Sequence, residues 1–116
     1  GGGAYAPVIS PLTLTKYVDN ASPYLAISLL NNNIIMEATL TVRKAGKDAL
    51  DYLKIKMWAV RVIDLTNGGS GGDDRLVETV ALDFSRVCYE YTPQKEDGTG
   101  DATIVKCWDI SANVEY

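Results

Sequence analysis

The sequence contains no histidine, and this absence excludes several kinds of chemistry. Most enzymes use histidine to move protons near neutral pH, and structural zinc sites draw on histidine or on closely spaced cysteines. The two cysteines, Cys88 and Cys107, are far apart in the chain and have no histidine partner that could activate a thiol. We therefore predict a protein that is not an enzyme and that binds neither a metal nor a cofactor.

An excess of basic charge and a long apolar run are also missing. The chain has a net charge of −4, and its 11 Lys and Arg are scattered among 15 Asp and Glu, so a basic patch for nucleic acid is not supported. No segment approaches the ~20 consecutive apolar residues of a membrane helix, so we expect no membrane insertion. The first residues lack the basic start and the apolar stretch of a signal peptide. We expect folding in the cytoplasm unless a signal has been cut away.

Two long β-type segments, residues 52–64 and 75–91, dominate what is present. Apolar and polar residues alternate along much of both, which predicts strands with two different faces. Both segments exceed the average strand of about five or six residues, so we expect long antiparallel strands of a barrel or a strongly bent sheet. The glycine-rich loop between them, residues 66–75, cannot bury anything and must project.

Three shorter segments also alternate, and they predict strands at residues 11–18, 34–43 and 102–110. In the second of these, the residues expected to face inward are Met36, Ala38, Leu40 and Val42. Residues 92–101, rich in Gly, Asp and Pro, predict an exposed turn. Residues 1–9 are expected to be a flexible start of a single domain that covers residues 1–116.

One short helix is predicted between Ser22 and the asparagines at 31–33. Ser22 is expected to be the N-cap, and Pro23 suits the first helical position. Asparagine tolerates the left-handed conformation that ends helices. The expected apolar face comprises Leu25, Leu29 and either Ala26 or Leu30. A helix of about ten residues is not stable alone, so this face must dock on the sheet.

Cys88 and Cys107 come opposite or nearly opposite each other if their strands form a hairpin around residues 92–101. A disulfide is then geometrically possible. Folding in the cytoplasm favours thiols, and we interpret the pair as two small side chains, with the disulfide as the alternative.

Five strands and one helix indicate a mainly β fold, an antiparallel β-barrel with one short flanking α-helix. Five strands can close the small barrel of some nucleic-acid-binding proteins, but the acidic charge disfavours that function. If the sheet instead stays open, its edges must be covered by another chain. This alternative predicts self-association.

The carboxylates do not form a recognisable site. On the long segments, Asp51, Glu78, Asp83 and Glu90 alternate with apolar residues, so we expect them on the solvated face. Asp73 and Asp74 follow Gly71 and Gly72 like part of a calcium loop, but the spaced acids and the closing glutamate are missing. Composition and motifs thus leave two classes, an assembly subunit and a monomeric or dimeric β-rich binding module.

Several segments together resemble the haemolysin-coregulated protein (Hcp) family of the type VI secretion system. The resemblance is carried by residues 14–25, by residues 40–56 with the run Arg-Lys-Ala-Gly, by residues 68–84 with Gly-Gly-Ser-Gly-Gly, by residues 89–94 with Tyr-Thr-Pro-Gln, and by residues 108–110. It extends in register from about residue 12 to the C-terminus.

The resemblance implies a phage tail-tube-like β-barrel that forms hexameric rings. The rings stack into a hollow tube inside a contractile sheath, carry a trimeric spike and transport effectors, and the subunits leave the cell through the apparatus without a signal peptide. Members of the family normally begin with a further segment that supplies the first strands. This chain starts in what resembles the glycine-rich loop after that segment, so we expect those strands to be missing.

We expect the glycine loop to contact a neighbouring subunit. Its glycines let the backbone lie against another surface, and an arginine offers a planar fork to a carboxylate. The predicted interface residues are Gly68, Gly69, Ser70, Gly71, Gly72, Asp73, Asp74 and Arg75. The alternative is a hairpin tip without a partner.

Overall fold

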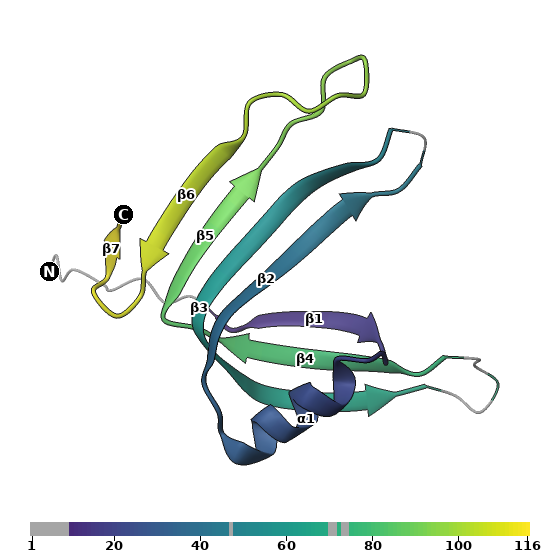
Figure 1. Ribbon diagram of the computed structural model, residues 1–116, viewed down its shortest axis with the longest axis vertical. Coiled ribbons are helices and arrows are strands. Elements are labelled where there is room, and N and C mark those ends of the chain that lie inside the picture. Colours follow the sequence, from purple (N-terminus) through teal and green to yellow (C-terminus); the bar gives the residue numbers. More distant parts are fainter. Residues whose placement is uncertain (1–9, 47, 70–71, 73–74) are drawn as a thin grey trace, which may run out of the picture. The chain divides into compact units, whose positions relative to one another are not determined.

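The computed structural model describes residues 10–46, 48–69, 72 and 75–116. Within these residues the chain forms one helix and seven strands (Figure 1). The elements are β1 (Leu12–Tyr17), α1 (Ser22–Asn31), β2 (Ile35–Lys44), β3 (Leu50–Gly68), β4 (Val77–Asp83), β5 (Arg86–Tyr91), β6 (Ile104–Asp109) and β7 (Val114–Glu115). The predicted class, mainly antiparallel β with one short helix, is confirmed. Closure into a barrel and the single domain stay predictions, and the start at residues 1–9 lies outside the described residues.

Strand β3 takes part in two compact units because it changes partner along its length. Residues 53–58 pair with β5, and residues 61–68 pair with β4. Between these stretches Ala59 has a φ of 52°, which is uncommon for a residue other than glycine. The register then shifts between Val62 and Asp64, as at a β-bulge. The first unit extends to Met36 and resumes over residues 59–84, and the second comprises residues 37–58 and 85–116.

The first unit holds the three-stranded arrangement β1–β4–β3 together with α1, which lies beside it (Figure 1). Both pairings are antiparallel, with Leu14 opposite Val80 and Leu65 opposite Val80 on the other side. Alternate residues of β3 and β4 are buried, as the period of two predicts. The buried hydrophobic residues of this unit are Val60, Val62, Val80, Leu82 and Phe84.

The second unit holds β2, the first part of β3, β5, β6 and β7. β2 pairs with β3, and β5 lies between β3 and β6 in antiparallel pairings. The buried hydrophobic residues of this unit are Ile55, Met57, Val87 and Cys88. In β2, Ala38, Leu40 and Val42 are half-buried as predicted, but Met36 is exposed. The boundary between the two units falls in β2 directly after Met36. Met36 therefore belongs to another unit than Ala38, Leu40 and Val42, and it need not be buried with them.

Three predicted boundaries were wrong. The segment predicted as one strand over residues 75–91 is two strands, because β4 and β5 pair with different parts of β3 and the chain must break between them. At the break, the Ser85 N–H donates to the Trp58 carbonyl at 3.0 Å. The glycine loop starts later than predicted, since β3 continues to Gly68, which pairs with Val77. The residues after 110, predicted as a short polar tail without a strand, contribute the short strand β7.

The turn predicted at residues 92–101 is confirmed. Gly98 has a φ of 91°, where a side chain would be strained. The backbone N–H and the hydroxyl of Thr99 both donate to Asp97, at 3.0 and 2.6 Å. The hydroxyl and then the backbone hydrogen bond hold the pKa of Asp97 below its ordinary value of 3.8. An isolated bridge between Gln94 and Gly100 closes the turn.

The helix ends as predicted but begins differently. Asn32 has a φ of 54° and its N–H donates to the Leu29 carbonyl, so an asparagine ends α1. The predicted N-cap was wrong: Ala21 occupies that position without a capping side chain, and Ser22 is the first helical residue. The Ser22 hydroxyl instead accepts a hydrogen bond from the Asp19 N–H at 2.9 Å. It also takes part in a contact with a residue far away in the chain.

That contact is with Glu78, which is 1% exposed although it was predicted on the solvated face. Glu78 shares the buried face of β4 with Val80 and Leu82. Lys16 stands opposite it in the β1–β4 register and donates to its carboxylate. Ser22 donates to the same carboxylate oxygen at 2.7 Å. A buried carboxylate is tolerated when its charge is paired and its lone pairs are satisfied, which explains the wrong prediction.

Glu78 and the three polar residues around it form what we call the helix anchor: Lys16, Asp19, Ser22 and Glu78. The hydrogen bond from Lys16 is the main cause that holds the pKa of Glu78 below 4.5; burial opposes it and Ser22 adds to it. Lys16, followed by the Ala21 N–H, also lowers the pKa of Asp19. Partial burial lowers the pKa of Lys16, but its two carboxylate partners outweigh burial and raise it above 10.5. The anchor is therefore fully charged at neutral pH.

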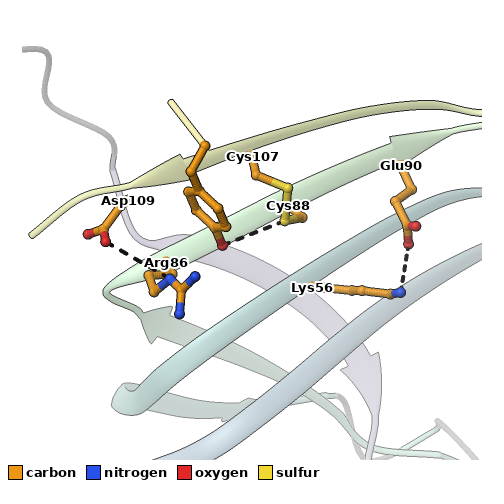
Figure 2. The surroundings of a disulfide bond; sticks show 7 residues. Lys56, Arg86, Cys88, Glu90, Cys107 and Asp109 are labelled. Atoms are coloured by element: carbon orange, nitrogen blue, oxygen red, sulfur yellow. Dashed lines mark hydrogen bonds and ion pairs between the residues drawn. A yellow bond between two sulfur atoms is a disulfide. The ribbon is translucent and has the colours of Figure 1, made fainter. Parts of the chain in front are cut away.

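Cys88 and Cys107 form a disulfide, so the interpretation as two thiols was wrong (Figure 2). The β5–β6 register places the two residues directly opposite each other, with their Cα atoms 4.0 Å apart. This is the close pairing that lets side chains on adjacent antiparallel strands meet. The Tyr116 hydroxyl lies 3.7 Å from the Cys88 sulfur, next to the bond.

The helix anchor predicts a pH-dependent stability. Because the folded pKa of Glu78 is depressed, its pairing contributes stability above pH 4.5 that is lost as the pH falls through the folded pKa. We expect Glu78→Gln to lower the free energy of unfolding at neutral pH by about 2 kcal/mol, less than for a fully buried pair because Lys16 is partly exposed. Thermal melts between neutral pH and about pH 3 should show the gap between parent and variant narrowing on acidification.

The exposed Glu37 on β2 supplies the matched control. Glu37→Gln makes the same chemical change without a buried partner, and we expect its melting curve to follow the parent at every pH. A Glu78→Gln protein that retained the whole pH dependence of the parent would contradict the role given to the anchor.

The disulfide predicts a redox-dependent stability. It closes a sequence separation of 19 residues, and cross-linking a loop of this size contributes about 3 kcal/mol, chiefly by constraining the unfolded chain. We expect a reductant to lower the melting temperature of the parent. The double variant Cys88→Ala, Cys107→Ala should melt like the reduced parent with or without reductant, and mass spectrometry of the intact protein reports the thiol state. Equal melting of the oxidised and reduced parent would contradict this.

Candidate assembly surface

The glycine loop leaves the first unit between β3 and β4, where Gly68 pairs with Val77. Of the predicted interface residues, Gly68, Gly69, Gly72 and Arg75 are described, and all four are exposed. The other four predicted residues, Ser70, Gly71, Asp73 and Asp74, lie outside the described residues. Their contact with a neighbouring subunit stays a prediction.

Arg75 lies over the ring of Tyr17, with its guanidinium carbon 4.2 Å from the ring centroid. The ring attracts the cation and fixes the direction of an otherwise flexible side chain. Tyr17 stands opposite Val77 in the β1–β4 register, so Arg75 lies beside the end of β1. Arg75 remains exposed, and the N–H groups of its planar guanidinium can still donate hydrogen bonds to a carboxylate of another molecule.

Apolar side chains surround this arginine. Tyr17, Val18 and Leu76 are each about half exposed, and the Val18 N–H donates to the Leu76 carbonyl at 3.0 Å, which holds the two segments together. We call Tyr17, Val18, Arg75 and Leu76 the loop-side patch. Our sequence reasoning missed its apolar members because Tyr17 and Val18 end one predicted strand and Leu76 begins another. The sequence signal that could have found them is their position, since all three are apolar residues next to turns. The structure brings them together at the same end of the β1–β4 pair.

Charged pairs cover the disulfide-bearing face of the second unit (Figure 2). Lys56 and Glu90 are 3.1 Å apart across the β3–β5 pair. Arg86 lies 4.0 Å from Asp109 across the β5–β6 pair, and its guanidinium stacks on Tyr116 at 4.5 Å. Exposed cross-strand pairs of this kind each contribute only about 0.2–1 kcal/mol to the stability. This face is polar and its charges are balanced by one another.

A hollow of about 330 Å³ lies elsewhere in the second unit. It is lined by Lys44, Leu50, Tyr52, Tyr91, Thr92 and Gln94. The rings of Tyr52 and Tyr91 meet edge to face at 6.4 Å, and Lys44 donates to the Gln94 side chain. The lining offers hydrogen-bond donors and aromatic rings, and none of its six residues is a carboxylate.

The described part of the chain lacks two further features. No three Cys, Asp or Glu side chains gather there as ligands for a metal ion. No helix there has the length and apolar character needed to cross a membrane.

Comparison with known proteins gives consistent results. Over residues 1–91 the sequence matches the family described as "Type VI secretion system effector, Hcp". It is 42% identical over 109 residues to Protein hcp1 of Pseudomonas aeruginosa, covering 92% of this chain and 67% of that protein. Hcp1 from Salmonella typhimurium has a similar structure, with a TM-score of 0.83 and 33% identity over 97% of this chain and 76% of that one. A type VI secretion system effector from Yersinia pestis gives a TM-score of 0.75 at 27% identity, over 91% and 75% of the two chains.

The sequence match and the shared fold agree with the segments that carried the resemblance. The family match alone covers well over half of the chain, and the β-rich fold of the described residues is that of solved Hcp structures. The chain belongs to the Hcp family of the type VI secretion system.

Proposed function

We propose that this protein is a structural subunit of the type VI secretion inner tube and acts by self-assembly, without catalysis. Membership of the Hcp family supports a type VI secretion tube protein. Beyond that, six copies form a ring, and the rings stack into a hollow tube that carries effectors. The observation that carries the proposal is the 42% identity over 109 residues to the Pseudomonas aeruginosa protein, together with the surface feature below.

One feature of the described residues favours assembly over a monomeric binding module. The loop-side patch combines half-exposed apolar residues with an oriented arginine, which is the composition of interface centres.

The proposed partners follow from the tube. Copies of this chain are the principal partner, and the spike, the sheath and the effectors are the others. The protein folds in the cytoplasm and leaves the cell through the type VI apparatus. This route requires no nucleic-acid contact and no membrane insertion.

Light scattering coupled to size-exclusion chromatography tests the proposal. We expect a particle whose mass corresponds to a ring of 12.6 kDa subunits, and electron microscopy should show its central hole. A homogeneous monomer or dimer at high protein concentration would support the binding module and overturn the tube proposal.

The glycine loop supplies a second prediction. We expect Arg75→Glu, and separately deletion of residues 68–72, to weaken assembly while the melting temperature of the subunit changes little. Arg75→Glu loses a cation–π contact worth only about 0.5–1 kcal/mol at an exposed site, but it places a negative charge where a neighbouring carboxylate is expected. Sedimentation velocity measures assembly, and a thermal melt measures folding.

Two variants control for charge and geometry. Lys95→Glu makes the same change of net charge on the exposed turn after β5, and we expect normal assembly. Arg75→Lys keeps the charge but loses the planar fork, and we expect a partial defect. If Arg75→Glu and the deletion both assemble like the parent, the loop is a tip without a partner.

A further inference from the structure

Helix α1 contains no charged residue. Its ten residues read Ser-Pro-Tyr-Leu-Ala-Ile-Ser-Leu-Leu-Asn. A helix at the surface of a globular protein normally has an apolar face toward the core and a charged or polar face toward water. A helix that is apolar on both faces is normally buried on both. The composition of α1 therefore requires a second surface besides its own sheet.

The structure shows which face lacks that surface. Leu25, Ala26 and Leu29 are half-buried on the inner face. Tyr24, Ile27 and Leu30 follow one another at intervals of three residues on the outer face, and they are 78%, 53% and 78% exposed. We call these three residues the outer stripe. Side chains at this spacing are neighbours on a helix surface, so the stripe is continuous.

The outer stripe continues beyond the helix at both ends. Past its C-terminal end, Ile34 is also about half exposed. At its N-terminal end, Ser22 accepts a hydrogen bond from the Asp19 N–H and one from Lys16. This tight connection holds the start of α1 against the end of β1, where Tyr17 and Val18 of the loop-side patch lie. The start of α1 and the loop-side patch are thus close to each other in the first unit.

The area is large for a free surface. Side chains of this size bury roughly 150–250 Å² each when aromatic and somewhat less when aliphatic. Together, the stripe and the apolar members of the patch expose on the order of 500 Å², the upper range for the largest patch of a monomer. A stable interface buries about 800 Å² on each partner, with an apolar centre and a polar rim. Stripe and patch supply that centre, and the exposed Thr66 and Asn67 at the start of the glycine loop supply part of the rim.

We propose that the outer stripe of α1 is the apolar centre of a contact with a second copy of this chain. The proposal rests on the proposed tube function and names a surface for it. A closed ring requires two different patches on every subunit, one for each neighbour, and the stripe and the loop-side patch together form one such surface. The stripe has no charge that could select an acidic or a basic partner. It also lacks the Lys and Arg residues that flank membrane-surface helices.

Substitution of Leu30 tests the proposal. Leu30→Lys keeps the length and the helix propensity of the side chain, but it brings a charge to the centre of the contact. We expect the protein concentration needed for assembly to rise at least about tenfold, as for a central interface residue. Sedimentation velocity over a concentration series measures this shift. The melting temperature should change little, because Leu30 is exposed within its own subunit.

Two control variants separate the contact from general effects. Leu30→Met keeps an apolar side chain of similar volume, and we expect assembly like the parent. Thr39→Lys adds the same charge at an exposed position on β2, outside the stripe, and we expect assembly like the parent there too. An Ile27→Lys variant should repeat the defect of Leu30→Lys, since both residues belong to the stripe.

The outcomes distinguish this inference from the proposed function. If the parent forms rings and Leu30→Lys and Ile27→Lys form them at the same concentration, the stripe contacts no second copy and only this inference is overturned. If these variants form rings normally but fail to bind purified sheath, a different partner covers the stripe, and the inference is again overturned. A parent that stays monomeric at every concentration overturns both. Loss of rings in the two lysine variants, with normal rings in the two controls, is the expected result.

Discussion

The change of partner along β3 is the constraint on which the rest of the structure depends. One strand, Leu50–Gly68, pairs with β5 in its first part and with β4 in its second. β2, β4 and β5 take their places from the parts of β3 that they meet, and β1, β6 and β7 follow through β4 and β5. The segment after the glycine loop cannot follow β3 past this point as one strand, so it divides at Phe84 and Ser85. The left-handed conformation of Ala59 marks the same point on β3.

The helix anchor illustrates how a short helix without good capping is kept in place. α1 has no side-chain cap at its start and no charged residue in its first or last turn, so local interactions alone give it little stability. Tertiary polar contacts replace them. Glu78 holds the first turn through Ser22, and Arg61 donates to the side chain of Asn32 at the other end, at 3.0 Å. Both contacts join the helix to strands of the first unit.

Period-two alternation predicted most strands and the fold class, because the facing of a strand is a local property of the sequence. The partner of a strand is not local, so the division of residues 75–91 could not be found from the pattern. Glu78 shows the same limit: a lone carboxylate on a strand is usually exposed, and only the cross-strand position of Lys16 makes its burial possible. The disulfide was missed for another reason. The register was foreseen as an option, but the expected compartment was given more weight.

The candidate assembly surface could likewise be predicted only in part. The loop was visible in the sequence through its glycines, and the family resemblance gave it a role, whereas the apolar residues beside it were assigned to strand ends. The helix was predicted with a single apolar face, which either Ala26 or Leu30 was expected to complete. In the structure Leu30 is exposed. The second apolar face of α1 can be recognised only when the structure shows which face is half-buried in the subunit. If the outer face of α1 is covered on assembly, as we propose, it stays in water before that, and the net charge of −4 then has a use. Mutual repulsion of like-charged subunits keeps weak apolar encounters from becoming aggregates, while a contact that fits over a large area still outweighs it at the short screening length of physiological salt, about 8 Å.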